Sequence, residues 1–183
     1  MSAALVNPIR YRPIDWSRDG PALQAFDAAY VTDRCYRVVA DGLGFTLHDV
    51  PLAVPFRKRY DLSGLDEDIA AAGFTLIAHQ GESVAGFATA TYHAWQRSVT
   101  LDNLFVAPAR QRRGVGAHLV AATAVYARGT PARQVWLETQ TTNVAAIDFY
   151  RAQGFGLCGL DLALYDPQQV DPREVALYLA RPL

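Results

Sequence analysis

The sequence has few of the residues that mark several classes of protein. Its 183 residues contain two cysteines, Cys35 and Cys158, a count that excludes a disulfide scaffold or a zinc site built on cysteines. No run of about 18 apolar residues occurs, so no membrane span is expected. The stretch before Arg10 lacks the basic start, apolar run and cleavage site of a signal peptide. These absences predict a soluble protein of the cytoplasm.

Charge of one sign is not in excess either. The 17 basic and 18 acidic residues leave a formal net charge of −1, which argues against a nucleic-acid-binding surface spread over the chain. Lys58 is the only lysine, and we attribute the preference for arginine to GC-rich codon usage. Hydrophobic residues make up 51%, enough for a packed core. The length favours a single domain over residues 1–183.

The pattern of apolar residues predicts a mixed chain. Asp19 and Pro21 are interpreted as start signals of the first helix, and Gly154 as the end of the last one. Strands are expected at 9–14, 36–39, 45–47, 74–79, 84–92, 98–106, 133–140, 155–165 and 175–180, and helices at 15–30, 65–72, 113–127 and 144–153. This order predicts an α+β fold, in which helices flank a sheet with several antiparallel strands.

A glycine-rich turn between an apolar strand and an apolar helix is the most informative stretch. A turn that opens a helix leaves several backbone N–H groups unpaired, and the helix dipole adds partial positive charge, so the turn suits phosphate. A Walker loop is excluded because it needs a lysine, and Leu119 stands where a dinucleotide fingerprint needs glycine. An ordinary helix start with a solvated basic turn is the alternative. The turn comprises Gln111, Arg112, Arg113, Gly114, Val115, Gly116 and Ala117.

Two motifs in this order resemble those of one family. Gln111-x-x-Gly114-x-Gly116, after a strand ending in Val106, is similar to the acyl-CoA signature of the GNAT N-acetyltransferase superfamily. The second signature is matched by Trp136-Leu137-Glu138-Thr139, Asn143, Ala146, Phe149-Tyr150 and Gly154-Phe155. The resemblance implies a mixed, mostly antiparallel sheet flanked by helices. It also implies acetyl-CoA as co-substrate.

Three further stretches resemble the streptothricin acetyltransferase group within that family. They are 137–141 with Asn143, Gly159, Asp161 and Tyr165, then 55–60, and finally 174–178. The narrower resemblance implies that the acceptor is a small cationic amine, with the β-lysine amine of streptothricin as the leading candidate. We therefore expect an enzyme of antibiotic resistance that transfers acetyl directly in a ternary complex.

The family resemblance also implies roles for single residues. The pantetheine arm of the cofactor is expected between the strands that carry Leu104 and Trp136, and backbone groups at Leu104, Phe105 and Val106 are expected to bind it. Asn143 is expected to bond its amides, and Tyr150 to protonate the leaving thiolate as general acid. The alternatives are a plain helix N-cap for Asn143 and a half-buried aromatic for Tyr150.

Two isolated carboxylates lie in apolar strands. Asp102 and Glu138 are costly in an interior unless they are paired, so each invites a functional explanation. One interpretation is that they bind the cationic acceptor, with one of them acting as the base; the other is a structural hydrogen-bonding acid. The resemblance places Asp161 and Tyr165 in the same region. The four histidines show no metal-ligand spacing, so no metal is expected.

Two other functions stay open at this point. The same chemistry would serve an acetyltransferase for proteins or polyamines, and the loop alone would serve a non-catalytic acyl-CoA sensor. No nucleic-acid or membrane partner is expected, and a homodimer is left open.

Overall fold

Residues 7–183 are described by a computed structural model, in which the chain forms two compact units. The first unit comprises residues 7–28, Tyr60–Val135 and Leu183, and the second comprises Ala29–Arg59 and Trp136–Pro182. One domain over residues 1–183 stays a prediction. Residues 1–6, which belong to the stretch examined for a signal peptide, lie outside the described residues.

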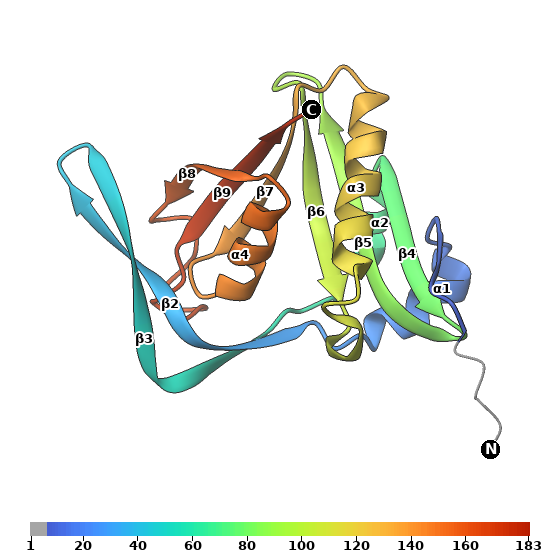
Figure 1. Ribbon diagram of the computed structural model, residues 1–183, viewed down its shortest axis with the longest axis horizontal. Coiled ribbons are helices and arrows are strands. Elements are labelled where there is room, and N and C mark those ends of the chain that lie inside the picture. Colours follow the sequence, from blue (N-terminus) through green and yellow to red (C-terminus); the bar gives the residue numbers. More distant parts are fainter. Residues whose placement is uncertain (1–6) are drawn as a thin grey trace. The chain divides into compact units, whose positions relative to one another are not determined.

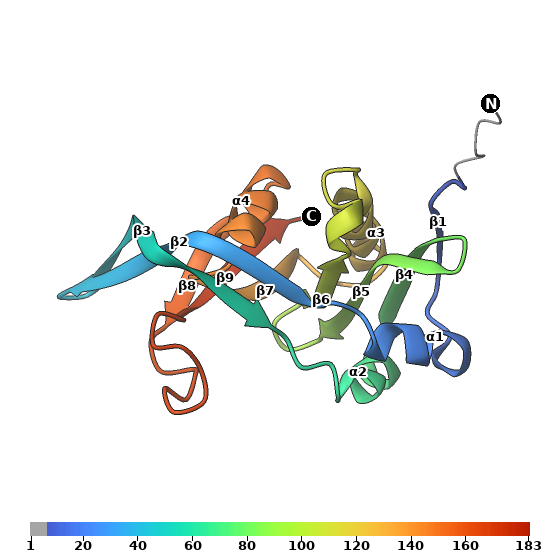
Figure 2. The ribbon, with the colours of Figure 1, turned by 90° about the horizontal axis from the view of Figure 1, so that it is seen from below.

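The first unit contains an antiparallel sheet covered on both faces. Its strands follow the order β1-β4-β5-β6. Helix α3 covers one face, and helices α1 and α2 cover the other (Figure 1, Figure 2). The elements are β1 (Arg10–Arg12), α1 (Trp16–Gln24), α2 (Leu65–Ala71), β4 (Phe74–Gln80), β5 (Ser83–His93), β6 (Ser98–Val106), the short 3-10 helix η1 (Pro108–Arg110) and α3 (Val115–Arg128). The core between the sheet and α1 and α2 is built on Leu23, Leu65, Ile77 and Phe87.

The first helix begins close to its predicted start and ends earlier than predicted. Asp15 is the N-cap, because its carboxylate accepts a hydrogen bond from the backbone N–H of Ser17. Asp19 lies in the first turn, as a start signal should: its buried carboxylate accepts from the backbone N–H of Asp15 at 2.9 Å and from the Arg12 guanidinium at 2.6 and 2.7 Å. Pro21 lies inside the helix. The predicted span 15–30 is also too long, since α1 ends at Gln24 and the chain re-enters a strand at residue 29.

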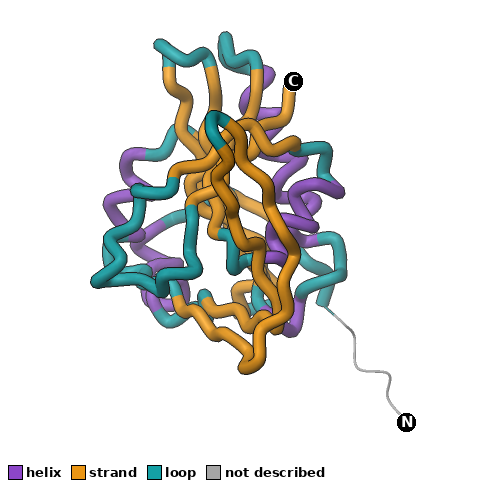
Figure 3. Tube along the Cα trace, turned by 90° about the vertical axis from the view of Figure 1, so that its left-hand side faces the viewer, coloured by secondary structure: helices purple, strands orange, loops and turns teal. Residues whose placement is uncertain are grey.

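The second unit contains a long hairpin and a three-stranded group. The hairpin consists of β2 (Ala29–Asp41) and β3 (Gly44–Arg59), joined at Gly42 in a left-handed conformation (φ +58°). Figure 3 shows its two strands running side by side. The other strands, in the order β7-β9-β8, are β7 (Gln134–Gln140), β8 (Gly156–Asp161) and β9 (Ala176–Pro182), and α4 (Val144–Ala152) follows β7.

The hairpin is much longer than the two short strands predicted at 36–39 and 45–47. Pro51 and Pro55 interrupt the strand signal in β3, since proline has no N–H for a ladder hydrogen bond. The hairpin is fastened to the rest of its unit by the N–H of Tyr36, which donates to the carbonyl of Thr141 at 3.0 Å. Arg34 adds ion pairs to Asp49 and Asp148.

Most other elements match their predictions to within two residues. The strand 98–106 is confirmed at both ends, and the helices expected at 65–72, 113–127 and 144–153 are found. The strand expected at 155–165 ends at Asp161, because the Asp161 carboxylate accepts from the N–H of Ala163 and turns the chain. The α+β class with a mostly antiparallel sheet and flanking helices is confirmed. Within residues 7–183 no helix has the length and apolar character that a membrane crossing requires.

Candidate active site

The predicted phosphate loop lies in the first unit, between the end of β6 and the start of α3. After η1 the side chain of Gln111 donates to the carbonyl of Val106 at 3.3 Å, which ties the loop back to the strand. Two residues then take left-handed conformations, Arg112 (φ +59°) and Gly114 (φ +82°). Arg112 is not a glycine, so its backbone is strained, a feature that concentrates at binding and catalytic loops.

The start of α3 is suited to an anion. Its N-cap is Gly114. No side chain caps the helix, so no side-chain oxygen accepts a capping hydrogen bond from the first-turn N–H groups of Val115, Gly116 and Ala117. No atom lies within 4 Å of the position that a Cβ would occupy on Gly114. Alternating left-handed residues aim successive N–H groups into one concavity, and exposed Arg112 and Arg113 add charge. The loop therefore fits the pyrophosphate of an acyl-CoA.

The strand that enters the loop is held closely by its neighbour. Gly86 of β5 pairs with Val106, and a Cβ on Gly86 would approach the carbonyl oxygen of Phe105 to 2.6 Å. Only glycine permits this approach of the two backbones. Leu104, Phe105 and Val106 are half-buried, and the Phe105 ring packs on Phe87 with ring centroids 5.3 Å apart. The end of β6 is thus closely packed against β5.

Asp102 does not occupy the interior position that the sequence suggested. It lies on β6, but its side chain is exposed and accepts a hydrogen bond from the Thr91 hydroxyl at 2.7 Å. Partial loss of water raises the pKa of Asp102, and the hydrogen bond from Thr91 opposes that change. Apolar neighbours along a strand do not bury a residue, because successive side chains point to opposite faces.

Glu138 is the carboxylate that the fold encloses, in the second unit. It lies half-buried on β7, and its Oε1 accepts a hydrogen bond from the Tyr165 hydroxyl. The Gln140 amide donates to the Tyr165 oxygen at 3.1 Å and lies 3.4 Å from Glu138 Oε1. Desolvation raises the pKa of Glu138, while the Tyr165 hydrogen bond and the charge of Lys58 oppose the rise. The expected association of Glu138 with Tyr165 is confirmed.

A buried ion pair lies beside this carboxylate. The Lys58 ammonium of β3 pairs with the Glu174 carboxylate, whose side chain is 2% exposed. Lys58 Nζ also lies 5.8 Å from the centre of the Tyr165 ring. Glu138, Tyr165, Lys58 and Glu174 are called the Glu138 cluster below. Sequence reasoning gave Lys58 no role, although its being the only lysine beside sixteen arginines was a signal that could have found it.

Asn143 and Tyr150 belong to α4 of the second unit. Asn143 is the N-cap, and its Oδ1 accepts from the N–H of Ala146 at 3.3 Å, as the plainer of its two interpretations requires. Tyr150 is 8% exposed and packs edge-on against Phe155, with ring centroids 5.7 Å apart. Binding of pantetheine by Asn143 and proton donation by Tyr150 stay predictions.

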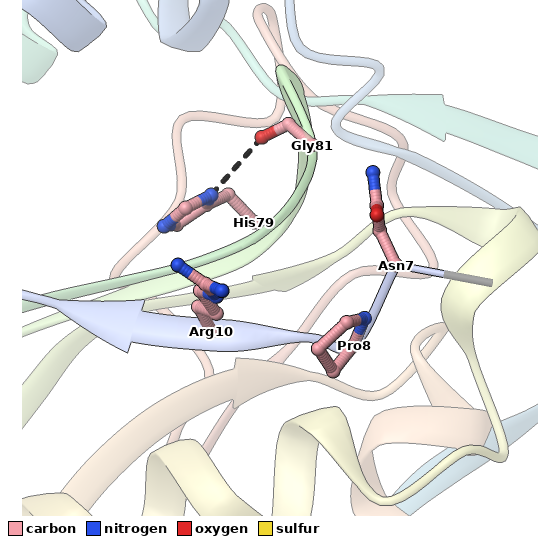
Figure 4. A pocket seen from close by; sticks show the side chains of 5 residues that line it. All are labelled: Asn7, Pro8, Arg10, His79 and Gly81. Carbon is pink, nitrogen blue, oxygen red and sulfur yellow. Dashed lines mark hydrogen bonds between the residues drawn. The ribbon is translucent and has the colours of Figure 1, made fainter. Parts of the chain in front are cut away.

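A surface hollow of the first unit carries none of the predicted site residues. It lies where β1 meets the turn between β4 and β5, and His79 there bonds the carbonyl of Gly81 at 3.0 Å (Figure 4). Among the described residues, no group of histidine, cysteine and carboxylate side chains is arranged to hold a metal ion.

The chain is similar to known proteins over most of its length. Residues 45–155 match the model of the acetyltransferase (GNAT) family. A streptothricin acetyltransferase of Streptomyces lavendulae is 35% identical over 172 residues, which are 90% of each chain. The crystal structure of a nourseothricin acetyltransferase superposes with a TM-score of 0.84 at 38% identity, covering 95% of this chain and 98% of the other.

A more distant structure shares the fold. A protein from Bacillus anthracis, solved in complex with acetyl coenzyme A, gives a TM-score of 0.77 at 23% identity, with 97% of this chain and 99% of that chain covered. The family match spans more than half of the chain and includes the phosphate loop. The chain belongs to the acetyltransferase (GNAT) family and is an acetyl-CoA-dependent N-acetyltransferase.

Proposed function

We propose that this enzyme acetylates a primary amine of a streptothricin-type antibiotic. The Glu138 cluster carries the proposal, because its half-buried carboxylate is the kind of group that would hold a small cationic acceptor. The relatives at 35% and 38% identity act, by their names, on streptothricin and nourseothricin, which supports the same acceptor class. A polyamine or a protein N-terminus is the alternative acceptor.

The first unit is proposed to hold the co-substrate. Acetyl-CoA supplies the acetyl thioester when it is bound. The N–H groups of Val115, Gly116 and Ala117 would bind phosphate oxygens, and Arg112 and Arg113 would add charge-assisted hydrogen bonds. Backbone groups of Leu104, Phe105 and Val106 would bind the pantetheine arm, and one of their N–H groups would polarise the thioester carbonyl. In the same proposal, the Asn143 side chain binds the amides of the pantetheine arm.

Glu138 is proposed to bind the acceptor ammonium and to receive its proton. An ammonium cannot attack a carbonyl until it has lost a proton, and a carboxylate with a raised pKa is a better base than an ordinary one. Tyr165 donates a hydrogen bond to the carboxylate, and the Gln140 amide donates to the Tyr165 oxygen. Asp102 is the second candidate for this role, and its exposure makes it the weaker one.

Tyr150 is proposed as the general acid. A phenol can protonate or hydrogen-bond a departing thiolate, and a ring that is 8% exposed delivers the hydroxyl from a fixed position. Tyr150 packs against Phe149 and Phe155, so its orientation is set by α4 and the turn that follows it.

The experiment is a substrate panel with the purified protein. Acetyl-CoA is mixed in turn with streptothricin, a polyamine and a short peptide, and release of free thiol is followed. Mass spectrometry then tests whether the acceptor has gained one acetyl group at its β-lysine amine. We expect efficient turnover of streptothricin only. A preference for the polyamine or the peptide would overturn the proposed acceptor class.

A further inference from the structure

The Glu138 cluster contains two carboxylates and one ammonium. Glu174 is the more deeply buried carboxylate, with a side chain that is 2% exposed, and it forms an ion pair with Lys58. Glu138 instead accepts from the neutral hydroxyl of Tyr165. The pair Lys58–Glu174 is neutral in sum, so the ionised cluster has one negative charge. That charge belongs to Glu138.

The choice of lysine at this position has a physical reason. An arginine presents a planar fork of five donors and matches a carboxylate bidentately, whereas the lysine ammonium is a compact point charge. Lys58 reaches one oxygen of Glu174 and lies 5.8 Å from the centre of the Tyr165 ring, where the aromatic face attracts a cation. The ammonium therefore pairs with Glu174 and lies within cation–π range of the Tyr165 ring. Every other basic residue of the chain is an arginine.

Removing the Lys58 ammonium would leave Glu138 and Glu174 as two carboxylates with no cation in the cluster. Two ionised carboxylates with no lysine between them repel each other, and one of them takes up a proton. Glu174 does oppose ionisation of Glu138, and Lys58 favours it. The two effects have opposite signs and come from the two members of one ion pair. Lys58 thus offsets the effect of Glu174 on the ionisation of Glu138.

We propose that Lys58, fixed by Glu174, is a positioning residue that reserves the single negative charge of Glu138 for the acceptor ammonium. This inference deepens the proposed function and rests on it. Lys58 does not touch the reacting atoms in this proposal; it acts on the acceptor through Tyr165 and Glu138. The substrate class that fits is a monocationic primary amine at this subsite, because one ammonium neutralises the cluster.

Titratable side chains from several segments interact with Glu138. Lys58 comes from β3, Glu174 from the segment before β9, Tyr165 from the segment after β8, and Tyr178 from β9. Desolvation raises the pKa of Tyr178, and the charges of Asp161 and Glu138 add to the rise. The phenols are neutral near pH 7, so Lys58 and Glu174 are the charges that variants should alter.

The test is a double-mutant cycle on the full chain with two readouts. The variants are Lys58→Met, Glu174→Gln and the two together, and Arg57→Met, at an exposed neighbouring position of β3, is the matched control. The first readout is the titration midpoint of the Glu138 carboxyl carbon, measured by NMR without acceptor. The second is the pH profile of kcat/KM with streptothricin.

The expected shifts have opposite signs. Lys58→Met should raise the Glu138 midpoint by about half a pH unit or more, and Glu174→Gln should lower it. The double variant should return it toward the wild-type value, and Arg57→Met should leave it unchanged. The acid limb of kcat/KM should move with the midpoint. A merely structural ion pair would lower the melting temperature without moving the midpoint in opposite directions.

The outcomes separate this inference from the function on which it rests. If Lys58→Met does not fold, Glu174→Gln and the double variant still test the role of Lys58. Both should fold, because neither leaves a buried carboxylate without its cation. An unchanged midpoint in the folded variants overturns the role of Lys58. Shifted midpoints in a protein that does not acetylate streptothricin support the electrostatic role and overturn the proposed acceptor. Shifted midpoints with an unmoved kcat/KM profile overturn the link to the acceptor.

Discussion

Tyr165 and Glu138 lie 27 positions apart, and the phenol donates a hydrogen bond to the carboxylate. Tyr165 is in the segment that follows β8, and Glu138 is on β7. The segment between β8 and β9 therefore contributes to the candidate site as well as connecting two strands. Glu174, at the other end of the same segment, adds the second carboxylate of the cluster. The properties of Glu138 consequently depend on a part of the chain that has no regular secondary structure.

Tyr165→Phe should make Glu138 harder to ionise. The variant removes the hydrogen bond that lowers the pKa of Glu138 and keeps the aromatic ring near Lys58. The midpoint of the acid limb of kcat/KM should rise, and kcat/KM at neutral pH should fall by roughly 3- to 10-fold. Affinity for acetyl-CoA, measured by calorimetry, should not change. A pH profile that coincides with that of the wild type would contradict a role for Tyr165 in positioning the carboxylate.

Glu138→Gln should lower the activity and raise the stability at pH 7. Turnover of a small cationic amine should fall by about 100-fold, because the amide cannot accept a proton. The Glu138 pKa is raised in the folded protein, so folding of the wild type becomes less favourable as pH rises from its ordinary value of 4.5 through the raised one. The melting temperature of the variant should therefore exceed that of the wild type at pH 7, and the difference should vanish below pH 4.5.

The control for this substitution is Glu82→Gln, at an exposed position in the turn between β4 and β5. It removes the same charge and should alter neither turnover nor the pH dependence of melting. Asp102→Asn is the informative comparison. Equal losses of activity in Asp102→Asn and Glu138→Gln would show that enclosure does not decide which carboxylate serves as the base.

Several features of the site could be predicted from the sequence because they are local. The phosphate loop depends on glycines at fixed spacing between a strand and a helix, and Gly114 has the positive φ that this pattern suggests. The helix that begins at residue 115 and the N-cap at Asn143 follow from the same kind of short-range signal. Such features depend on a few adjacent residues and need no knowledge of the tertiary structure.

Features that depend on distant residues were not predictable in the same way. The pairing of Lys58 with Glu174 spans 116 positions, and nothing near either residue indicates its partner. Asp102 and Glu138 have similar apolar neighbours in sequence, yet one is exposed and the other is half-buried. The full length of the hairpin escaped prediction because its strands are mostly exposed and lack an alternating apolar pattern. Burial is decided by what packs on each face of a strand, which the strand's own sequence does not contain.

Tyr150→Phe should separate chemistry from binding. The phenylalanine ring keeps the packing against Phe155, so the variant should fold as the wild type does. If the hydroxyl protonates the departing thiolate, kcat should fall by about 100-fold while the affinity for acetyl-CoA is retained. Tyr126→Phe, on α3, is the control and should keep full activity. Full activity in Tyr150→Phe would leave the ring with a packing role alone.

Gly114→Ala should weaken acetyl-CoA binding, and Gly42→Ala provides a matched control. Both glycines have a positive φ, of +82° and +58°, and neither has an atom within 4 Å of a Cβ position. Alanine at either site should therefore cost about 1 kcal/mol of stability through backbone strain alone. Gly42 lies at the tip of the β2–β3 hairpin, far along the chain from the phosphate loop.

The difference between the two glycine variants should lie in the cofactor. An alanine that resists the left-handed conformation at residue 114 turns the N–H groups of the first turn of α3 away from a common point, and their bonds to phosphate weaken together. Calorimetry should show a Kd for acetyl-CoA about 10-fold higher in Gly114→Ala and an unchanged Kd in Gly42→Ala. Equal affinities in the two variants, at equal losses of melting temperature, would mean that the glycine serves only to start the helix and that the phosphates are bound elsewhere.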